Sequence, residues 1–168
     1  LRNRRQRQMC IRDRLKINTT APAFTSQSTS KKNYSLKDSV GKYVVLYFYP
    51  KDNTPGCTTE TNDFNKLLSS FKKLDCEIYG ISKDSLDSHD KFRDKYKIKF
   101  DLLADEELKL LKKYKVWGKK KFMGREFMGI IRSTYLIDKK GKIIKVWNNV
   151  KVKDHAKEVL ETLKSIVK

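Results

Sequence analysis

The chain has 168 residues, of which 38% are hydrophobic and 35% charged, and this composition indicates one folded domain rather than a disordered segment. The formal net charge of +19 requires an acidic partner such as nucleic acid to be considered, but most lysines are scattered among Asp and Glu, which is typical of a solvated surface. The sequence has neither an apolar run of about twenty residues nor a secretory signal, so it predicts a soluble protein without a membrane partner.

Residues 1–14 have no apolar pattern and carry six arginines against Asp13, a net charge of +5. We expect this tail to be disordered or foreign to the fold, which leaves residues 15–168 as the domain. An organellar transit peptide would be rich in serine as well as arginine, and this stretch has no serine. Residues 7–14 resemble translated sequencing-adaptor sequence, which is the interpretation we favour, and Cys10 then has no biological role.

From residue 15 onward the sequence alternates between apolar strands and amphipathic helices. The expected elements, in order, are extended segments at 21–24 and 34–36, a strand at 43–49, a helix at 57–72, a strand at 76–82, a helix at 86–96, a strand at 100–103, a helix at 105–113, strands at 133–138 and 142–147 joined by a turn, and a helix at 154–167. The strand at 43–49 is apolar throughout, as expected of a central parallel strand. Parallel βαβ units followed by a hairpin and a helix predict an α/β protein with a thioredoxin-like fold, in which helices flank a central mixed sheet.

Cys57 is placed at the beginning of a helix by the residues that precede it. Thr54 is a favourable N-cap residue, and Pro55 suits the first helical position, where its missing N–H costs nothing. The unpaired N–H groups of the first turn and the positive end of the helix dipole favour an anion there. We therefore expect Cys57 to be a readily ionised, partly exposed thiol, and we interpret the chain as a thiol enzyme.

The cysteines also bear on the compartment and on metals. Cys10, Cys57 and Cys76 do not have the spacing of zinc ligands or of the disulfide framework of a secreted protein. We expect a reducing, cytoplasmic location and no metal.

Four separated motifs resemble those of the peroxiredoxins, specifically the bacterioferritin comigratory protein or peroxiredoxin Q type. They are YFYPKDNTPGCTTE at residues 47–60, GISKDS at 80–85, SHDKF at 88–92 and MGIIRST at 128–134. The resemblance covers about 150 residues in the expected order. It implies a thioredoxin-like fold and a thiol-dependent peroxidase that needs no metal, haem or flavin cofactor.

The resemblance also implies a role for each site residue. Cys57 would be the peroxidatic cysteine, which attacks hydrogen peroxide or a small organic hydroperoxide and becomes a sulfenic acid. Arg132 would hold the thiolate and the peroxide, Thr54 would supply a hydroxyl to the peroxide, and Pro50 would limit water near the sulfur. Glu60 is expected to support the site by orienting the arginine, although an ordinary acid in the first turns of a helix would look the same.

The sequence departs from the family where the sulfenic acid is resolved. Many members of this type carry a second cysteine five residues after the first, and this chain has Asn62 there. Cys76 follows a predicted helix of about fifteen residues, whose rise of ~1.5 Å per residue puts it roughly 20 Å from Cys57, too far for a disulfide. We predict a one-cysteine mechanism in a monomer, with thioredoxin, glutaredoxin or a small thiol as the reductant, and a packing role for Cys76.

Two other functions are alternatives to the peroxidase. A thioredoxin-like disulfide reductase needs a Cys-x-x-Cys pair, and Cys57 is followed instead by Thr58, Thr59 and Glu60. A basic module that binds nucleic acid or acidic surfaces would use the charge alone, without an arginine and aromatic platform, so no nucleic-acid partner is expected.

Other residues are assigned packing roles. We interpret His89 and His155 as structural residues on charged helices rather than as bases or metal ligands. Five large side chains are expected to pack in a loop near the active site, namely Trp117, Phe122, Met123, Phe127 and Met128.

Overall fold

The computed structural model describes residues 15–167. The predicted tail at residues 1–14, including Cys10, lies outside the described residues, and so does Lys168. Among the helices described, none is long and apolar enough to cross a lipid bilayer.

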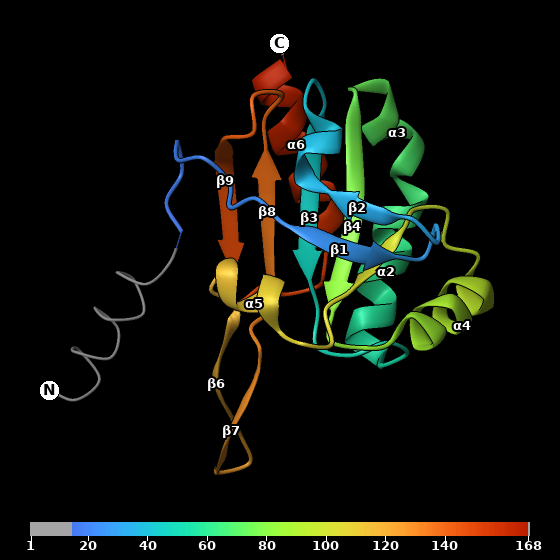
Figure 1. The fold of residues 1–168 in the computed structure, drawn as a ribbon, viewed down its shortest axis with the longest axis vertical. Helices are drawn as coiled ribbons and strands as arrows, with labels where there is room; N and C mark the ends of the chain where they lie inside the picture. Colours follow the sequence, from blue (N-terminus) through green and yellow to red (C-terminus); the bar gives the residue numbers. More distant parts are fainter. Residues whose placement is uncertain (1–14, 168) are drawn as a thin grey trace, which may run out of the picture.

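A seven-stranded sheet in the order β2-β1-β5-β4-β3-β8-β9 forms the centre of the molecule (Figure 1). Its strands in chain order are β1 (Thr25–Ser28), β2 (Asn33–Ser35), β3 (Tyr43–Phe48), β4 (Cys76–Ser82), β5 (Leu102–Ala104), β8 (Ser133–Ile137) and β9 (Ile143–Asn148). The central strands β3, β4 and β5 are parallel, whereas β1 pairs antiparallel with β5 and β8 pairs antiparallel with β3. The structure thus confirms the predicted mixed sheet with parallel strands at its centre.

Helices cover both faces of this sheet (Figure 1). They are η1 (Leu36–Ser39), α2 (Pro55–Lys66), α3 (Leu68–Lys73), α4 (Leu86–Tyr96), α5 (Lys109–Lys113) and α6 (His155–Val167). Side chains of β3 alternate between two cores: Val45 and Tyr47 pack with α2, α3 and α6, while Leu46 and Phe48 pack with α5. Because the cysteine helix α2 follows directly after β3, the fold places its first turn at the carboxyl end of the central strands.

Several predicted boundaries were wrong. The helix predicted at 57–72 is divided at Leu67, whose φ of −94° and ψ of 2° end α2 before α3 begins. The helix predicted at 105–113 starts only at Lys109, because Leu108 has a φ of +64° and its N–H bonds to the carbonyl of Asp105. Strand β5 spans Leu102–Ala104 rather than residues 100–103. The segment expected to be extended at 21–24 leads into β1, which begins at Thr25.

The loop predicted around residues 117–128 is a hairpin. Strands β6 (Trp117–Phe122) and β7 (Arg125–Ile130) pair only with each other among the described strands. They are joined by Met123 and Gly124, both with positive φ, as tight hairpin turns require. Only Trp117 packs against the core as predicted, since the side chains of Met123, Phe127 and Met128 are 88%, 48% and 49% exposed. The side chain of Phe122 lies outside the described part of the structure.

Candidate active site

The first turn of α2 presents Cys57 as its third residue. Thr54 occupies the N-cap position with extended backbone angles, and Pro55 is the first helical residue, as predicted. The Thr54 hydroxyl donates to the carbonyl of Lys51 at 2.9 Å and does not cap the helix, which corrects the expected capping role of that side chain. The hydroxyl instead closes the loop that precedes the cysteine.

A stripe of four buried residues fixes α2 against the sheet. Cys57, Glu60, Thr61 and Phe64 recur at helical spacing on the buried side. Tyr47 of β3 donates its hydroxyl to Thr61 at 3.0 Å, and its ring stacks on Phe64 with the ring centroids 4.7 Å apart. These contacts set the position of the helix, and therefore of Cys57, relative to the sheet.

Arg132 joins the cysteine to the acid of the same helix. It lies between β7 and β8, 75 residues from Cys57 in the chain. One guanidinium nitrogen, Nη2, donates to Cys57 Sγ at 3.3 Å, and the other, Nη1, donates to Glu60 Oε1 at 2.7 Å. Gly56 makes room for this fork, because a Cβ there would lie 3.3 Å from the same Nη2. The arrangement holds a permanent cation beside the sulfur in a fixed orientation.

Burial and the attraction between the two charges act in opposite directions on the pKa of Glu60 and on that of Arg132. Burial raises the pKa of Glu60 to about 7, and the attraction of Arg132 offsets only part of that effect. Although its own burial acts in the opposite direction, the charges of Glu60 and Cys57 raise the pKa of Arg132. Glu60 Oε2 is buried and has no hydrogen-bond partner. Arg132 is therefore a cation that the protein cannot readily lose, held 3.3 Å from the Cys57 sulfur.

The expectation of a partly exposed thiol was wrong, because Cys57 is only 1% exposed. Thr54 and Pro50 are half-buried at the two ends of the loop that precedes α2. The four residues predicted to be catalytic, Cys57, Thr54, Pro50 and Arg132, thus belong to α2, the loop before it and the strand connection that carries the arginine.

A buried hydrogen-bond network, which the sequence did not reveal, holds this loop in place. His89 of α4 places Nδ1 2.7 Å from Asp52 Oδ2 and Nε2 2.9 Å from the carbonyl oxygen of Leu103. Tyr49 donates its hydroxyl to Asp52 Oδ1 at 2.6 Å, and Ser88 donates to Oδ2 at 2.8 Å. The two ring nitrogens of His89 thus face two acceptors, the Asp52 carboxylate and the Leu103 carbonyl, which hold the ring at both ends. We call Tyr49, Asp52, Ser88 and His89 the loop clamp.

The loop clamp also explains a grouping that resembles a metal site. Ligand atoms of Asp52, Asp84 and His89 lie within 4.8 Å of one another. Asp84 Oδ2 accepts from the backbone N–H of Asp52 at 2.8 Å and from the hydroxyl of Ser82 at 2.6 Å. Hydrogen bonds therefore account for this cluster without an ion.

His155, the other histidine, is the first residue of α6. Its Nε2 is 2.7 Å from the hydroxyl oxygen of Thr134, and its ring contacts Phe64 and Trp147 edge-on. Burial, with a smaller contribution from Arg132, lowers the pKa of His155 to about 4. A neutral His155 packs beneath the site and is not part of it.

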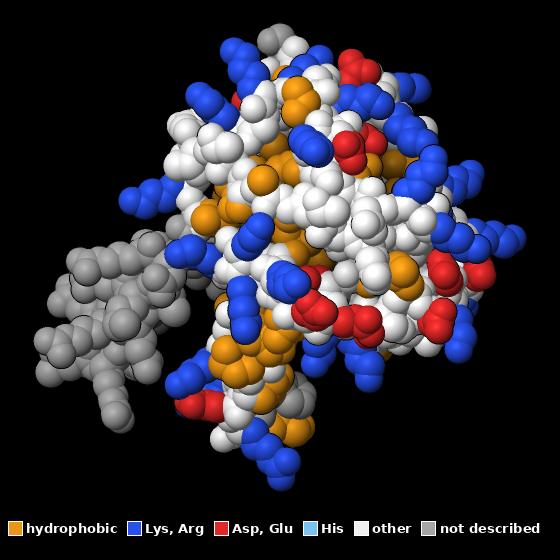
Figure 2. All heavy atoms as spheres, viewed as in Figure 1, with side chains coloured by type: hydrophobic (Ala, Val, Ile, Leu, Met, Phe, Trp, Pro, Cys, Tyr) orange, Lys and Arg blue, Asp and Glu red, His pale blue; other side chains and the backbone are white. Residues whose placement is uncertain are grey.

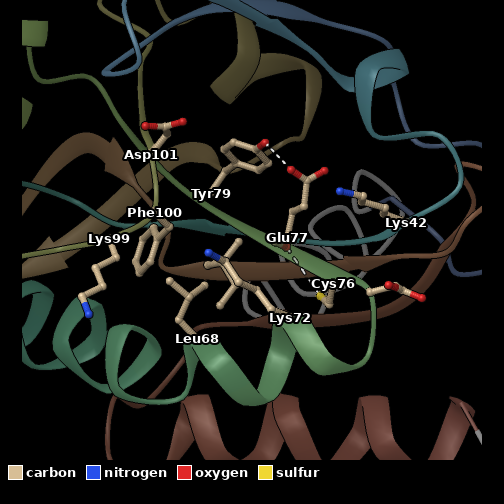
Figure 3. A pocket seen from close by; sticks show the side chains of 11 residues that line it. Lys42, Leu68, Lys72, Cys76, Glu77, Tyr79, Lys99, Phe100 and Asp101 are labelled. Atoms are coloured by element: carbon tan, nitrogen blue, oxygen red, sulfur yellow. Dashed lines mark hydrogen bonds between the residues drawn. The ribbon is translucent and has the colours of Figure 1, made fainter.

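Cys76 is remote from Cys57, as the sequence predicted. It pairs with Tyr43 at the first residue of β3, whereas α2 follows the last residues of that strand, roughly 16 Å away at ~3.3 Å per residue. Figure 3 shows Cys76 in a separate pocket with Lys72 and Glu77, and no residue lining this pocket belongs to the Arg132 fork. Burial raises the pKa of the Cys76 thiol, which disfavours its thiolate. Asn62, the expected position of a second cysteine, is half-buried in α2.

Comparison with known proteins identifies the family. The model of the AhpC/TSA family matches residues 17–146. The chain belongs to the AhpC/TSA family. It is 50% identical to peroxiredoxin Bcp of Bacillus subtilis over 152 residues, which cover 90% of this chain and 97% of the relative. Peroxiredoxin Bcp of Escherichia coli is 37% identical over 150 residues, 89% of this chain and 96% of the relative.

Solved structures agree with this assignment. A Xanthomonas campestris bacterioferritin comigratory protein, described for its alkyl peroxide reduction activity, superposes with a TM-score of 0.85 at 38% identity and covers 91% of this chain and 100% of its own. A cysteine-to-serine mutant of Xylella fastidiosa PrxQ gives 0.87 at 37% identity, covering 92% and 98%. The predicted family and the thioredoxin-like fold are confirmed. This AhpC/TSA protein is a peroxiredoxin, a thiol peroxidase, and a basic binding module is not favoured.

Proposed function

We propose that this peroxiredoxin reduces hydrogen peroxide and small organic hydroperoxides at Cys57 by a one-cysteine mechanism. The observation that carries the assignment is the Arg132 fork, which donates to the Cys57 sulfur at 3.3 Å and to Glu60 at 2.7 Å. A buried cysteine without a function would not require a half-buried arginine that donates to its sulfur, because removing a charge from water is costly.

The chemistry follows from the positions of these groups. The Cys57 thiolate attacks one peroxide oxygen, so that an S–O bond forms as the O–O bond breaks and sulfur is oxidised to the sulfenic acid. The departing oxygen leaves as water or an alcohol after taking up a proton. Arg132 stabilises the negative charge that moves from sulfur to the leaving oxygen, and the Thr54 hydroxyl offers a further polar contact at the mouth of the loop. Pro50 has no N–H and limits water at that edge.

Resolution is proposed to use an external thiol. Cys76 lies at the far end of β4 and in a different pocket, and position 62 is an asparagine. The reductant is a thioredoxin-type protein, glutaredoxin or a small thiol. A monomeric state, a cytoplasmic location and the absence of a nucleic-acid partner remain predictions from the sequence.

Intact-protein mass spectrometry tests this function. The reduced chain is given one equivalent of hydrogen peroxide, alongside Cys57→Ser and Cys76→Ser variants. We expect a gain of one oxygen that a sulfenic-acid reagent traps, that Cys57→Ser loses and that Cys76→Ser retains.

Two other outcomes would contradict the proposal. A loss of two hydrogens that requires both cysteines would make Cys76 the resolving residue. No change in mass, together with salt-sensitive binding to nucleic acid, would favour the binding module instead.

A further inference from the structure

The β6–β7 hairpin forms a two-stranded sheet of its own, separate from the main sheet. It projects from the end of the sheet at which β3 ends, beyond the body of the molecule (Figure 1). Its base is closed by a hydrogen bond from the N–H of Ile131 to the carbonyl of Val116 at 2.7 Å. A two-stranded ribbon with exposed edges is only marginally stable in water, so the chain maintains it at a cost in stability.

Apolar side chains are concentrated on this ribbon. Three of the seven exposed large hydrophobic residues in the described chain lie on it: Met123 at 88%, Phe127 at 48% and Met128 at 49% exposure. Figure 2 shows hydrophobic surface over the hairpin, bordered by basic side chains. Exposed aromatic and methionine side chains of this kind are enriched at protein interfaces.

The positive charge of the hairpin favours an acidic partner over a second copy of the chain. Lysines 119–121 and Arg125 stand against Glu126 alone, which gives the ribbon a net charge of +3. A second copy of the chain would bring two molecules of formal charge +19 together, and their repulsion disfavours self-association through this element. An acidic partner is attracted to the same surface.

The hairpin is adjacent to the reactive sulfur. Strand β7 leads through Ile131 directly into Arg132, which donates to Cys57 Sγ. Lys120, which pairs with Phe127, lies within electrostatic range of Arg132 and Cys57. Burial and the charge of Arg132 lower the pKa of Lys120, whereas Cys57 acts to raise it. A protein bound on the Phe127 face would therefore have its own reactive group near Cys57.

We propose that the β6–β7 hairpin is the docking surface for the protein that reduces oxidised Cys57, a thiol protein with an acidic face around an apolar centre. This inference rests on the proposed function. The partner thiol attacks the Cys57 sulfenic acid, forming an S–S bond and releasing water. A second thiol of the partner then attacks that mixed disulfide, which returns Cys57 to the reduced state and leaves the partner as its own disulfide.

Steady-state peroxidase assays of the full chain with two kinds of reductant test the docking surface. The protein reductants are reduced thioredoxin and reduced glutaredoxin, and the small reductant is dithiothreitol. The variants are Phe127→Ser with Met128→Ser, and Arg125→Glu, because Arg125 is exposed and lies two residues from Phe127 on the same face of β7. Val40→Ser is the matched control, because Val40 is 68% exposed but lies before β3, at the opposite end of that strand from the site.

We expect both hairpin variants to lower kcat/KM for at least one protein reductant by about tenfold, a common loss when an interface anchor is truncated. Turnover with dithiothreitol, and the rate of Cys57 oxidation by hydrogen peroxide, should stay within about twofold of wild type, as should Val40→Ser in every assay. With the protein reductant, wild-type kcat/KM should also fall as salt is raised, because salt screens the exposed charges.

Three results would overturn the proposal: hairpin variants that turn over normally with the protein reductants, an equal loss with dithiothreitol, or a wild-type chain that neither protein reduces faster than dithiothreitol does. In each case continued turnover with dithiothreitol would leave the peroxidase function intact. Absence of turnover with every reductant would contradict the function itself.

Discussion

Replacement of His89 by leucine is expected to release the loop that carries Asp52 and Thr54 from α4, so that Thr54 is no longer held in position beside Cys57. The variant removes the imidazole that lies 2.7 Å from Asp52 and 2.9 Å from the carbonyl oxygen of Leu103. Asp52 is 6% exposed and retains only the hydroxyls of Tyr49 and Ser88 and its place beside Asp84. Leucine is similar in volume to histidine, so the main loss is electrostatic.

The magnitude follows from the burial of this pair. Leaving a buried polar group without its hydrogen-bond partner costs about 1–3 kcal/mol, and more for a carboxylate, so we expect His89→Leu to lower the free energy of unfolding by about 3 kcal/mol. Asp52 lies within the loop that carries Thr54, two residues before that threonine. A misplacement of about 1 Å in such a positioning element can lower a rate by up to about a hundredfold, so we expect a decrease of about ten- to a hundredfold in the reaction with peroxide.

Three measurements separate positioning from simple destabilisation. Urea unfolding gives the free energy, stopped-flow mixing with hydrogen peroxide gives the rate of Cys57 oxidation, and alkylation by iodoacetamide reports sulfur reactivity without a need for Thr54. Leu163→Ala is the matched control, because Leu163 of α6 is buried in the core. Its truncation should lower the free energy of unfolding by about 2–5 kcal/mol without removing a contact of the loop clamp. We expect only His89→Leu to lose peroxide reactivity out of proportion to alkylation. An unchanged peroxide rate in His89→Leu, or an equal decrease in Leu163→Ala, would refute the role of the loop clamp.

Three further predictions concern the site and its surroundings. Arg132→Lys should fold but react with peroxide about a hundredfold more slowly in stopped-flow assays, because an ammonium group cannot bridge Cys57 and Glu60 as the planar guanidinium does. A rate within about threefold of wild type would contradict this prediction. The fold lowers the pKa of His155 from 6.5 to about 4, so its contribution to stability is complete above pH 6.5 and is lost as pH falls toward 4. At about 1.4 kcal/mol per pKa unit, the free energy of unfolding of wild type in urea should fall over that range by on the order of 3 kcal/mol more than that of His155→Gln. Parallel pH profiles of the two proteins would refute this prediction. Cys76→Ser should retain peroxidase turnover with dithiothreitol within about twofold of wild type, because burial raises the pKa of the Cys76 thiol and disfavours its reactive thiolate. A large loss of turnover would show that Cys76 takes part in the reaction.

Local sequence was sufficient for the elements whose signals are local. The apolar run of β3, the Thr54-Pro55-Gly56 start of α2 and the turn at Gly141 were all predicted at about their observed positions. Each depends on backbone preferences or on alternation within a few residues, which a single chain segment carries by itself.

Family resemblance, and not periodicity, indicated Arg132. It is 75 residues from Cys57, and nothing in its neighbourhood distinguishes it from an ordinary arginine near a strand end. The loop clamp had no such indication. Asp52 and His89 are 37 residues apart and look like surface residues of charged segments, and only the packing of α4 beside β5 buries them together.

The hairpin shows the opposite error. Trp117, Phe127 and Met128 have the composition of a core segment, and the sequence therefore predicted packing. In the structure β6 and β7 pair with each other and leave the main sheet, so two of those side chains face water. The sequence by itself determined which segments become strands and helices and where the cysteine helix begins. The tertiary structure alone decided which distant charges meet and which apolar side chains remain uncovered, because both depend on contacts between elements that no local pattern encodes.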